Sequence, residues 1–285
     1  MKNGWLVVNG FLQGEKYATL YSLLLSEAKK RNVSLLLKRA DELVGIVGER
    51  IPAPPEFVIF WDKDIRLAEA LEAQGIPLFN SAKTVGICDD KAKTALAFSN
   101  AGVPTPKTVL APKTFDTVGY NDLTFLERAE ELLSYPFVIK ENYGSFGQQV
   151  YLVHTRAEAV NVISRISPKE FLMQEFIQES MGKDVRVNVV GGKAVASMLR
   201  HNERDFRSNI SNGGTAFLYA LSEEQEAVAL AACKAVGADF AGVDLLLGKT
   251  PLVCEINSNP HFKSTLDCTG VDLSKYIFEH ILERL

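Results

Sequence analysis

Two apolar stretches near the C-terminus, 241–247 and 252–257, carry three oxygen-bearing side chains that could bind a metal ion. These side chains belong to Asp244, Glu255 and Asn257. The residues between the stretches include a glycine and a proline, which predicts a tight turn and therefore a β-hairpin. Because side chains alternate between the two faces of a strand, Glu255 and Asn257 point to the same side of the second strand.

A symmetric closure of this hairpin on residues 249–250 sets Asp244 directly opposite Glu255, and Leu247 opposite Leu252. Directly opposed residues have Cβ atoms about 4.5–5.5 Å apart, and like charges at that spacing repel each other. The apolar neighbours predict burial, and a buried carboxylate pair needs a cation. Oxygen ligands without a thiol or an imidazole suit Mg²⁺ better than zinc. A solvated hairpin face explains the same spacing equally well, so both interpretations stay open on geometry alone.

The composition of the chain is that of an ordinary globular protein with room for two or three small domains. Its 285 residues are 47% hydrophobic and 23% charged. No apolar stretch approaches about 18 uninterrupted residues, so we expect no membrane span. The first residues run directly into a strand-like segment and lack the features of a signal peptide. The net charge of −4 predicts no general attraction to nucleic acid, so any polyanion must be held by a local basic cluster.

The four cysteines, Cys88, Cys233, Cys254 and Cys268, are scattered along the chain without a CxxC pair. This spacing predicts reduced thiols, as in a cytoplasmic protein. Cys233 and Cys254 lie within apolar patterns, and we expect both of them to be core residues.

Strands and helices alternate along the first part of the chain, to about residue 88. This alternation predicts a parallel sheet and therefore a small α/β domain. Gly4 and Gly10 do not form a GxGxxG turn, so a dinucleotide-binding fold has little support. Asp89 is expected to cap the next helix, which ends at Gly102 before a proline-rich boundary. The expected strands are 5–8, 34–37, 56–61 and 76–80, and the expected helices are 17–31 and 66–74.

Lys140 ends an apolar strand and precedes a loop that contains Gly144 and Gly147. A lysine at this position, together with the N–H groups of the loop, could contact phosphates. A long hairpin turn with a surface lysine is the competing interpretation of this segment.

The strand expected over 182–190 alternates polar and apolar side chains, so Asp184, Arg186 and Asn188 share one face. A Gly-Gly turn leads into the next strand, and Arg200 is expected just past its paired region. The remaining expected helices are 125–133, 158–166, 222–236 with a capping box at Ser222 and Gln225, and a final helix capped by Asp272.

A series of short motifs runs along the chain in this order: Asp90-Lys91, Pro136–Lys140, Gln174–Ile177, Asp184–Arg186, Asp205–Asn209, Gly213-Gly214, Ala241–Asp244, Glu255–Pro260 and Thr269–Asp272. Together they resemble the RimK-like carboxylate–amine ligases of the ATP-grasp superfamily, over nearly the whole chain. The resemblance implies an ATP-grasp fold that combines α/β and α+β parts. An N-terminal parallel-sheet α/β domain would span 1–90, and two ATP-clamping α+β lobes would span 91–177 and 178–285.

The resemblance further implies a cytoplasmic enzyme that forms an amide bond at the expense of ATP. In this family a carboxylate is activated by γ-phosphoryl transfer, and an amine then displaces phosphate from the acyl phosphate. The implied partners are ATP, a carboxylate on a peptide, protein or metabolite, and an amino acid such as glutamate. One or two ions of Mg²⁺ (or Mn²⁺) are implied, with two expected. A homo-oligomer (dimer or tetramer) is expected, with neither nucleic acid nor a membrane as partner.

The resemblance also assigns roles to single residues. The backbone of residues 175–176 would hydrogen-bond adenine, and Asp184 would lie near the ribose. Arg200 would stabilise the acyl phosphate, with Arg207 as a second catalytic residue. A surface arginine at a strand end is the competing interpretation for Arg200, and a cross-strand ion pair is the competing interpretation for Arg186. The implied ATP contacts are Lys91, Lys140, Ser145, Glu175, Phe176, Asp184, Arg207, Ser208 and Asn209, and the implied metal ligands are Asp244, Glu255 and Asn257.

Two departures from the family pattern bear on the substrate. Gln148 and Gln149 stand where a further glycine is usual, which predicts a stiffer loop over the nucleotide. His261, Phe262 and Lys263 follow the last proline of the motif series, and this is closer to the LysX-type ligases that modify an amino-group carrier protein. For His261, a substrate contact and a plain loop residue are equally open, and the role of Lys263 is open as well.

Two other functions remain as alternatives. An ATP-binding regulatory protein without turnover, as synapsins suggest, would share the fold but would not need Arg200. A nicotinamide-dependent oxidoreductase built on the N-terminal domain would need a glycine fingerprint that the sequence lacks.

Overall fold

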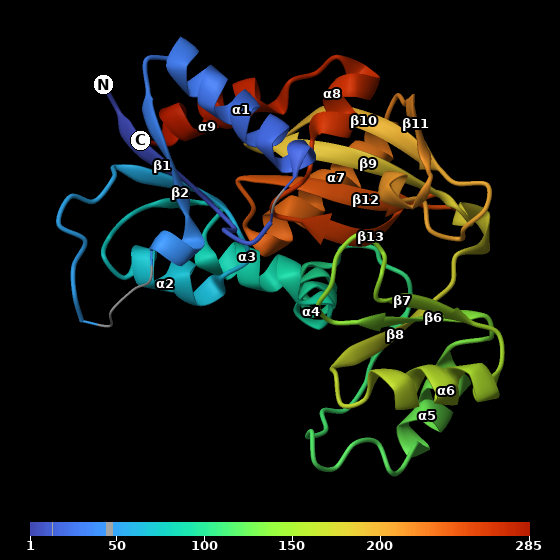
Figure 1. Ribbon diagram of the computed structural model, residues 1–285. Helices are drawn as coiled ribbons and strands as arrows, with labels where there is room; N and C mark the ends of the chain where they lie inside the picture. Colours follow the sequence, from blue (N-terminus) through green and yellow to red (C-terminus); the bar gives the residue numbers. More distant parts are fainter. Residues whose placement is uncertain (13, 44–47) are drawn as a thin grey trace.

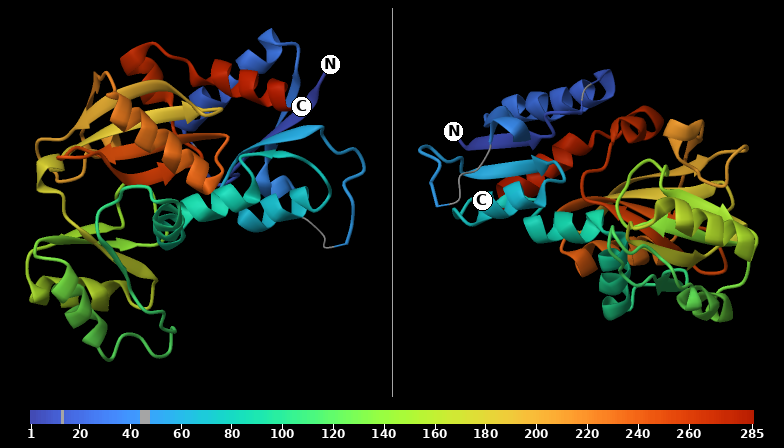
Figure 2. Two further views of the ribbon diagram at one scale, coloured as in Figure 1. Left: turned by 180° about the vertical axis from the view of Figure 1, so that it is seen from behind. Right: turned by 60° about the horizontal axis from the view of Figure 1, so that its bottom comes forward.

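The structure, a computed structural model, describes residues 1–12, 14–43 and 48–285. Three sheets, each built from a different stretch of the chain, carry helices packed against them (Figure 1). The first and last helices, α1 (Glu15–Lys30) and α9 (Leu273–Arg284), contact each other, and the two termini lie near each other (Figure 2). Within the described ranges, no helix is both long enough and apolar enough to cross a bilayer.

The N-terminal sheet is parallel with strand order β2-β1-β3-β4, as the alternation of strands and helices predicts. Helices cover both faces, which explains why its central strands are apolar throughout. Leu6 of β1 packs into the cluster formed with α1 and α9, whereas Val7 packs into the cluster formed with α2 on the opposite face. The elements are β1 (Asn3–Val8), β2 (Ser34–Arg39), the 3₁₀ helix η1 (Ala40–Glu42), β3 (Phe57–Trp61), α2 (Ile65–Glu72), β4 (Leu78–Phe79) and α3 (Ala82–Asp89).

The second sheet is antiparallel with strand order β5-β8-β6-β7 and forms the smaller unit at the bottom of Figure 1. Its helices pack on the face away from the rest of the protein, around a cluster that includes Phe137 and Phe171. The chain reaches this unit through α4 (Lys91–Ala101), which ends at Gly102 in the left-handed conformation (φ 68°), as predicted. The elements are β5 (Thr108–Leu110), α5 (Thr124–Leu132), β6 (Phe137–Glu141), β7 (Val150–Val153), α6 (Arg156–Ile166) and β8 (Phe171–Glu175).

The third sheet is antiparallel with strand order β11-β10-β9-β12-β13. One face packs against α7 through the valines of β9, and Asp184, Arg186 and Asn188 share the other face, as predicted. The predicted capping box of Ser222 and Gln225 opens α7. The elements are η2 (Gln178–Ser180), β9 (Lys183–Val190), β10 (Lys193–His201), η3 (Ile210–Asn212), β11 (Thr215–Leu218), α7 (Glu223–Val236), β12 (Phe240–Leu246), β13 (Leu252–Asn257) and α8 (Lys263–Thr269).

The predicted cap of α4 is wrong by one residue. Asp90 caps this helix, because its Oδ1 accepts bonds from the N–H groups of Ala92 (3.0 Å) and Lys93 (3.2 Å). Asp89 is instead the last residue of α3. Two consecutive aspartates offer two possible caps, and the sequence does not reveal that a separate helix runs up to the first of them.

The expected end of β10 is also wrong. Arg200 lies inside the paired region, opposite Asp184 of β9 and Ala216 of β11. A register shift between Ala194 and Ala196 precedes this part of the strand. Since β11 provides a second partner, β10 continues to His201 and fixes the direction of Arg200.

The hairpin of β12 and β13 closes almost as predicted. Asp244 lies opposite Glu255, but Leu252 pairs with Leu246 rather than with Leu247. The register shifts after Asp244, so that Cys254 becomes the extra residue of a β-bulge in β13.

Candidate functional site

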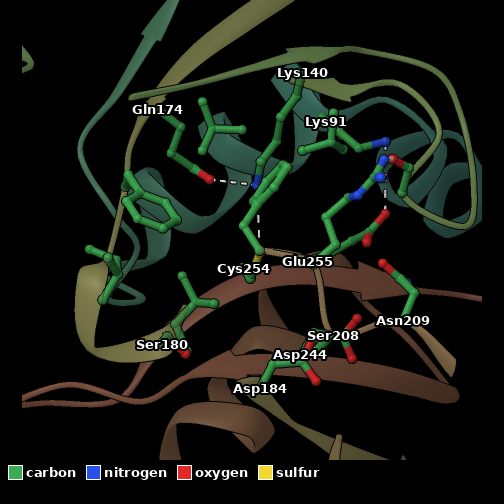
Figure 3. A pocket seen from close by; sticks show the side chains of 18 of the residues that line it. Lys91, Lys140, Gln174, Ser180, Asp184, Ser208, Asn209, Asp244, Cys254 and Glu255 are labelled. Atoms are coloured by element: carbon green, nitrogen blue, oxygen red, sulfur yellow. Dashed lines mark hydrogen bonds and ion pairs between the residues drawn. The ribbon is translucent and has the colours of Figure 1, made fainter. Parts of the chain in front are cut away.

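A cavity of about 870 Å³, open to solvent, lies between the second and third sheets (Figure 3). β6, β8 and the glycine loop line one side, and β10, β12, β13 and the segment 206–209 line the other. Every residue that the sequence predicts to bind ATP, metal or acyl phosphate lines this cavity, except Asn257.

Lys140 on β6 is buried, with 8% of its surface exposed, so the surface-lysine interpretation is wrong. Its ammonium group donates to Oε1 of Gln174 at 2.6 Å and lies 3.5 Å from Sγ of Cys254 (Figure 3). Cys254 therefore lines the cavity, and its prediction as a core residue is wrong. As the extra residue of the bulge, Cys254 can share the cavity side of β13 with Glu255. Burial raises the pKa of the Cys254 thiol.

The glycine loop is tied to both sides of the cavity. Lys91, the first residue of α4, donates to the carbonyl of Gly144 at 3.3 Å and lies 3.8 Å from the carboxylate of Glu255. On the opposite side, Nη1 of Arg207 donates to the carbonyl of Gly147 at 2.5 Å. Gly147 has φ +71°, and a Cβ atom there would lie only 2.7 Å from Oδ1 of Asn209. Glycine is therefore required where the loop approaches the 206–209 segment.

Arg207 is held by an ion pair that the sequence reading missed. Its guanidinium group donates to both carboxylate oxygens of Asp205, at 3.0 Å and 2.6 Å. These bonds hold the pKa of Asp205 below its ordinary value, and Asp205 in turn raises the pKa of Arg207. The pair fixes a cation beside the loop.

The end of the cavity near β8 is lined by apolar side chains. Phe176, Ile177 and Leu246 line it, which suits a planar ring. The N–H group of Glu175 already donates to the carbonyl of Lys107 at 2.9 Å. The backbone N–H group of Glu175 is therefore not free to bond adenine in the way that the sequence led us to expect.

The floor of the cavity is a buried network of alternating charges on the third sheet. Arg200 donates to both oxygens of Asp184, at 2.7 Å and 2.5 Å, and also lies 2.9 Å from Oδ2 of Asp244. The hydroxyl of Ser208 donates to Asp184. Arg200 is 5% exposed, so the interpretation of it as a surface arginine is wrong.

Arg186 forms the cross-strand ion pair that was its competing interpretation. It lies opposite Asp244 in the β9–β12 register, and its Nε and Nη2 atoms donate to the two carboxylate oxygens. Burial opposes ionisation of Asp244, but Arg186 and Arg200 outweigh it and hold the pKa of this carboxyl below its usual range. The network thus keeps Asp244 ionised and fixed in place.

The oxygen-bearing residues of the hairpin fit a hard divalent cation. Asp244 and Glu255 face each other in register, and Asn257, opposite Gly242, is the next residue on the same face of β13. The side chain of Glu255 is 34% exposed, and its carboxylate lies 3.8 Å from the ammonium group of Lys91. Oδ1 of Asp244 accepts one bond, although a carboxylate oxygen has two lone pairs. Two carboxylates and an amide are the ligands that Mg²⁺ prefers.

Within the described ranges, no cluster of three or more histidine, cysteine, aspartate or glutamate side chains is poised to hold a metal. The predicted ligand set does not require one, because its third member is the amide of Asn257. This set is therefore a prediction from ligand chemistry and strand register.

The residues after the hairpin have structural contacts. The ring of His261 bonds to the carbonyl of Lys16 at 3.1 Å and meets Tyr17 edge-on. Phe262 is fully buried in the core, and Lys263 pairs with Asp267 on α8.

Residues 88–281 match a RimK-like ATP-grasp domain. A probable alpha-L-glutamate ligase of Cellvibrio japonicus (strain Ueda107) is 36% identical over 220 residues, which are 74% of this chain and 69% of that protein. Human beta-citrylglutamate synthase B is 31% identical over 262 residues. That alignment covers 87% of this chain and 66% of the human protein, slightly less than two thirds of its length.

Solved structures show the same fold at lower sequence identity. D-alanine–D-alanine ligase from Bacillus anthracis superimposes with a TM-score of 0.75 and 18% identity, over 99% of this chain and 97% of that one. The ATP-grasp ligase PsnB, in complex with its minimal precursor, Mg and ADP, gives a TM-score of 0.71 and 15% identity, over 99% of this chain and 96% of that one. The chain belongs to the RimK-like ATP-grasp family of ligases, and the family, fold class and enzyme class predicted from its sequence are confirmed.

Proposed function

We propose that this protein is an ATP- and Mg²⁺-dependent ligase that joins a carboxylate to an amine through an acyl phosphate. One observation carries the proposal: a single cavity combines the cations of Lys91, Lys140 and Arg207 with the opposed carboxylates of Asp244 and Glu255. Cations beside a glycine loop suit a polyphosphate, and paired carboxylates suit the metal that accompanies it.

Activation by phosphate explains why such a site would use ATP. A carboxylate is a poor acylating agent because its leaving group would be oxide, whereas phosphate leaves readily. The γ-phosphoryl group passes through a transition state rich in negative charge, so positioned cations lower the barrier. Amine attack on the acyl carbon then forms the C–N bond, breaks the C–O bond to phosphate and releases a proton.

The residues of the cavity divide this task. Lys91, Lys140 and Arg207 would bind the phosphates, and Arg200, held by Asp184, would stabilise the acyl phosphate. The apolar end would hold the base, with ribose near Asp184. The remaining residues that would contact ATP are Ser145, Glu175, Phe176, Ser208 and Asn209.

Asp244, Glu255 and Asn257 would hold one or two Mg²⁺ ions. When bound, the metal would supply positive charge at the β- and γ-phosphates. The neighbouring arginines keep Asp244 ionised by lowering its pKa. The carboxylate of Glu255 is accessible and would exchange its contact with Lys91 for the metal.

The amine substrate that we propose is an amino acid, with glutamate as the first candidate. The relatives described above are named as a glutamate ligase and a beta-citrylglutamate synthase. The acceptor carboxylate belongs to a peptide, a protein or a small metabolite, and an amino-group carrier protein is a further candidate. The division at residues 90 and 177, the cytoplasmic location and the homo-oligomer stay predictions, and sedimentation tests the last of them.

The test is ADP release by the purified protein with Mg-ATP, L-glutamate and a panel of carboxylates. At least one carboxylate should stimulate ADP release, and Glu255→Gln should reduce it by about 10²-fold or more. Glu131→Gln is a matched control, because its side chain is 62% exposed on α5, outside the residues that line the cavity. Full turnover of Glu255→Gln would show that the metal assignment is wrong. Tight ATP binding without ADP release would favour a regulatory protein.

A further inference from the structure

The boundary between the N-terminal sheet and the third sheet contains a buried carboxylate, and one of its oxygens accepts no hydrogen bond from the described residues. Asp62, directly after β3, is 5% exposed, and its Oδ1 accepts bonds from Nδ2 of Asn9 (3.1 Å) and the N–H group of Lys63 (2.6 Å). Its Oδ2 has no hydrogen-bond donor within the described ranges. The ammonium group of Lys63 pairs with Asp89 instead, at 2.5 Å.

A second buried oxygen without a hydrogen-bond donor among the described residues belongs to Asn259, which lies next to Asp62. Asn259 donates from Nδ2 to the backbone carbonyl of Asp62 at 2.7 Å, so the two residues are in direct contact. Oδ1 of Asn259 is buried and has no donor within residues 1–12, 14–43 and 48–285. Buried polar atoms are seldom left unsatisfied, because desolvation is then uncompensated. Oδ2 of Asp62 and Oδ1 of Asn259 therefore mark a place where a ligand could donate hydrogen bonds.

Neighbours of these two residues connect them to the proposed site. It occupies the carboxyl end of parallel strands, where open α/β sheets bind ligands. Lys63 contacts the hydroxyl of Ser145 at 3.2 Å, and Ser145 lines the nucleotide cavity. On its other side, Asn259 follows the predicted metal ligand Asn257 by two residues. A group bound here would be close to the reacting end of the cavity.

The chemistry of the two acceptors favours a cation. Burial raises the pKa of Asp62, although the bonds from Asn9 and Lys63 act in the opposite direction. A buried carboxylate is stabilised by an opposite charge that also donates hydrogen bonds. A primary ammonium group has three N–H donors and no acceptor, so it can satisfy both oxygens. A water molecule could donate to them but would leave the charge uncompensated.

We propose that Oδ2 of Asp62 and Oδ1 of Asn259 bind the ammonium group of the amine substrate. The proposal rests on the ligase function above and extends it, because it assigns the amine a place at the boundary of the N-terminal sheet. Asp62 and Asn259 lie outside the group of residues that line the nucleotide cavity. Their loss should therefore affect the amine far more than ATP.

The experiment compares Asp62→Asn with the wild type, using L-glutamate as the amine and the carboxylate found in the ADP assay. Asp62→Asn keeps the shape of the side chain but removes the charge. We expect the KM for L-glutamate to rise about tenfold or more, and the KM for ATP to change less than about twofold. Asp116→Asn, an exposed residue far from β3 in the sequence, is the control and should match the wild type. Equal increases in both KM values, or an unchanged KM for L-glutamate, would overturn the proposal.

A second reaction separates this proposal from the ligase function itself. Hydroxylamine attacks an acyl phosphate as a neutral nucleophile and has no ammonium group to be bound. Hydroxamate formation by Asp62→Asn should therefore persist, while the reaction at low glutamate concentration falls about tenfold or more. If the wild type forms no hydroxamate, the ligase function is wrong; if both reactions fall together in the variant, the amine site is wrong.

The wild type provides a measurement that does not depend on folding of the variant. A crystal structure with L-glutamate and a non-hydrolysable ATP analogue should place the amino nitrogen within hydrogen-bond distance of Oδ2 of Asp62. A water molecule there, with the amino group elsewhere, would contradict the assignment.

Discussion

The guanidinium group of Arg186 lies directly against the backbone of Gly242. A Cβ atom on Gly242 would lie 3.0 Å from Nη1 and 3.1 Å from Cδ of Arg186, and 3.0 Å from Cβ of Pro260. The absent side chain leaves the space in which Arg186 pairs with Asp244 across β9 and β12. The position of a predicted metal ligand thus depends on a glycine two residues before it.

Gly242→Ala should therefore impair both activity and stability. The added methyl group must displace Arg186 or Pro260, and a small misplacement of Asp244 is expected to reduce the rate of ADP release by about tenfold to 10²-fold. Overpacking should cost roughly 1–3 kcal/mol of unfolding free energy in a urea titration. Gly248→Ala is a matched control in the same hairpin, because its nearest atoms would lie 3.7 Å away. Equal activity of the two variants would contradict this account.

Arg200 should prove difficult to replace even by lysine. It bonds both oxygens of Asp184 and also contacts Asp244, a geometry that a lysine ammonium group cannot reproduce. We expect Arg200→Lys to lose most ADP release, and Arg200→Met to lose about 3–5 kcal/mol of unfolding free energy as well, since buried carboxylates lose their partner. Arg128→Lys on the exposed surface of α5 should leave both measurements unchanged. A fully active Arg200→Lys would refute the role assigned to this residue.

The ion pair of Asp205 with Arg207 predicts a dependence of stability on pH. The folded-state pKa of Asp205 is lowered, chiefly by the hydrogen bonds from Arg207. Its contribution is therefore fully present above the unfolded pKa of about 3.9 and is lost as the pH falls through the lower folded value. Melting temperatures measured from pH 6 to pH 3 should converge for wild type and Asp205→Asn at the acidic end. A constant difference across this range would show that the pair does not stabilise the fold.

Cys254 offers a reporter of nucleotide binding. Its thiol lies beside the ammonium group of Lys140 in the cavity, and burial raises its pKa. Alkylation by iodoacetamide should be slow, should accelerate at alkaline pH and should be suppressed by ATP. Mass spectrometry can compare it with Cys233, which is buried in the core cluster of the third sheet and should be unreactive with or without ATP. If saturating ATP does not slow the alkylation of Cys254, the nucleotide binds elsewhere.

Much of the fold follows from local patterns in the sequence. Alternating polarity places Asp184, Arg186 and Asn188 on one face of β9. Asp244 lies opposite Glu255 as predicted, but a bulge at Cys254 produces this pairing in place of the symmetric closure that the sequence suggests. These features depend on residues that are near in sequence or on a period of two, so that no distant contact is needed to predict them.

Other features could not be predicted from local patterns, and several of them depend on distant partners. The bulge that turns Cys254 toward the cavity arises from a one-residue mismatch within the hairpin. The direction of Arg200 is fixed by a third strand, β11, and the contact of Asp62 with Asn259 joins segments 197 residues apart. Asp205 had a local signal, since it lies two residues before Arg207, but only the structure reveals their ion pair.

Trapping of the acyl phosphate tests the central claim most directly. The protein is incubated with Mg-ATP, hydroxylamine and a panel of carboxylates that includes citrate, and hydroxamate and nucleotide products are measured together. We predict equal amounts of hydroxamate and ADP with the right carboxylate, and neither product with Glu255→Gln. Formation of AMP instead of ADP, or of ADP without hydroxamate from any carboxylate, would contradict a γ-phosphoryl transfer to the acid.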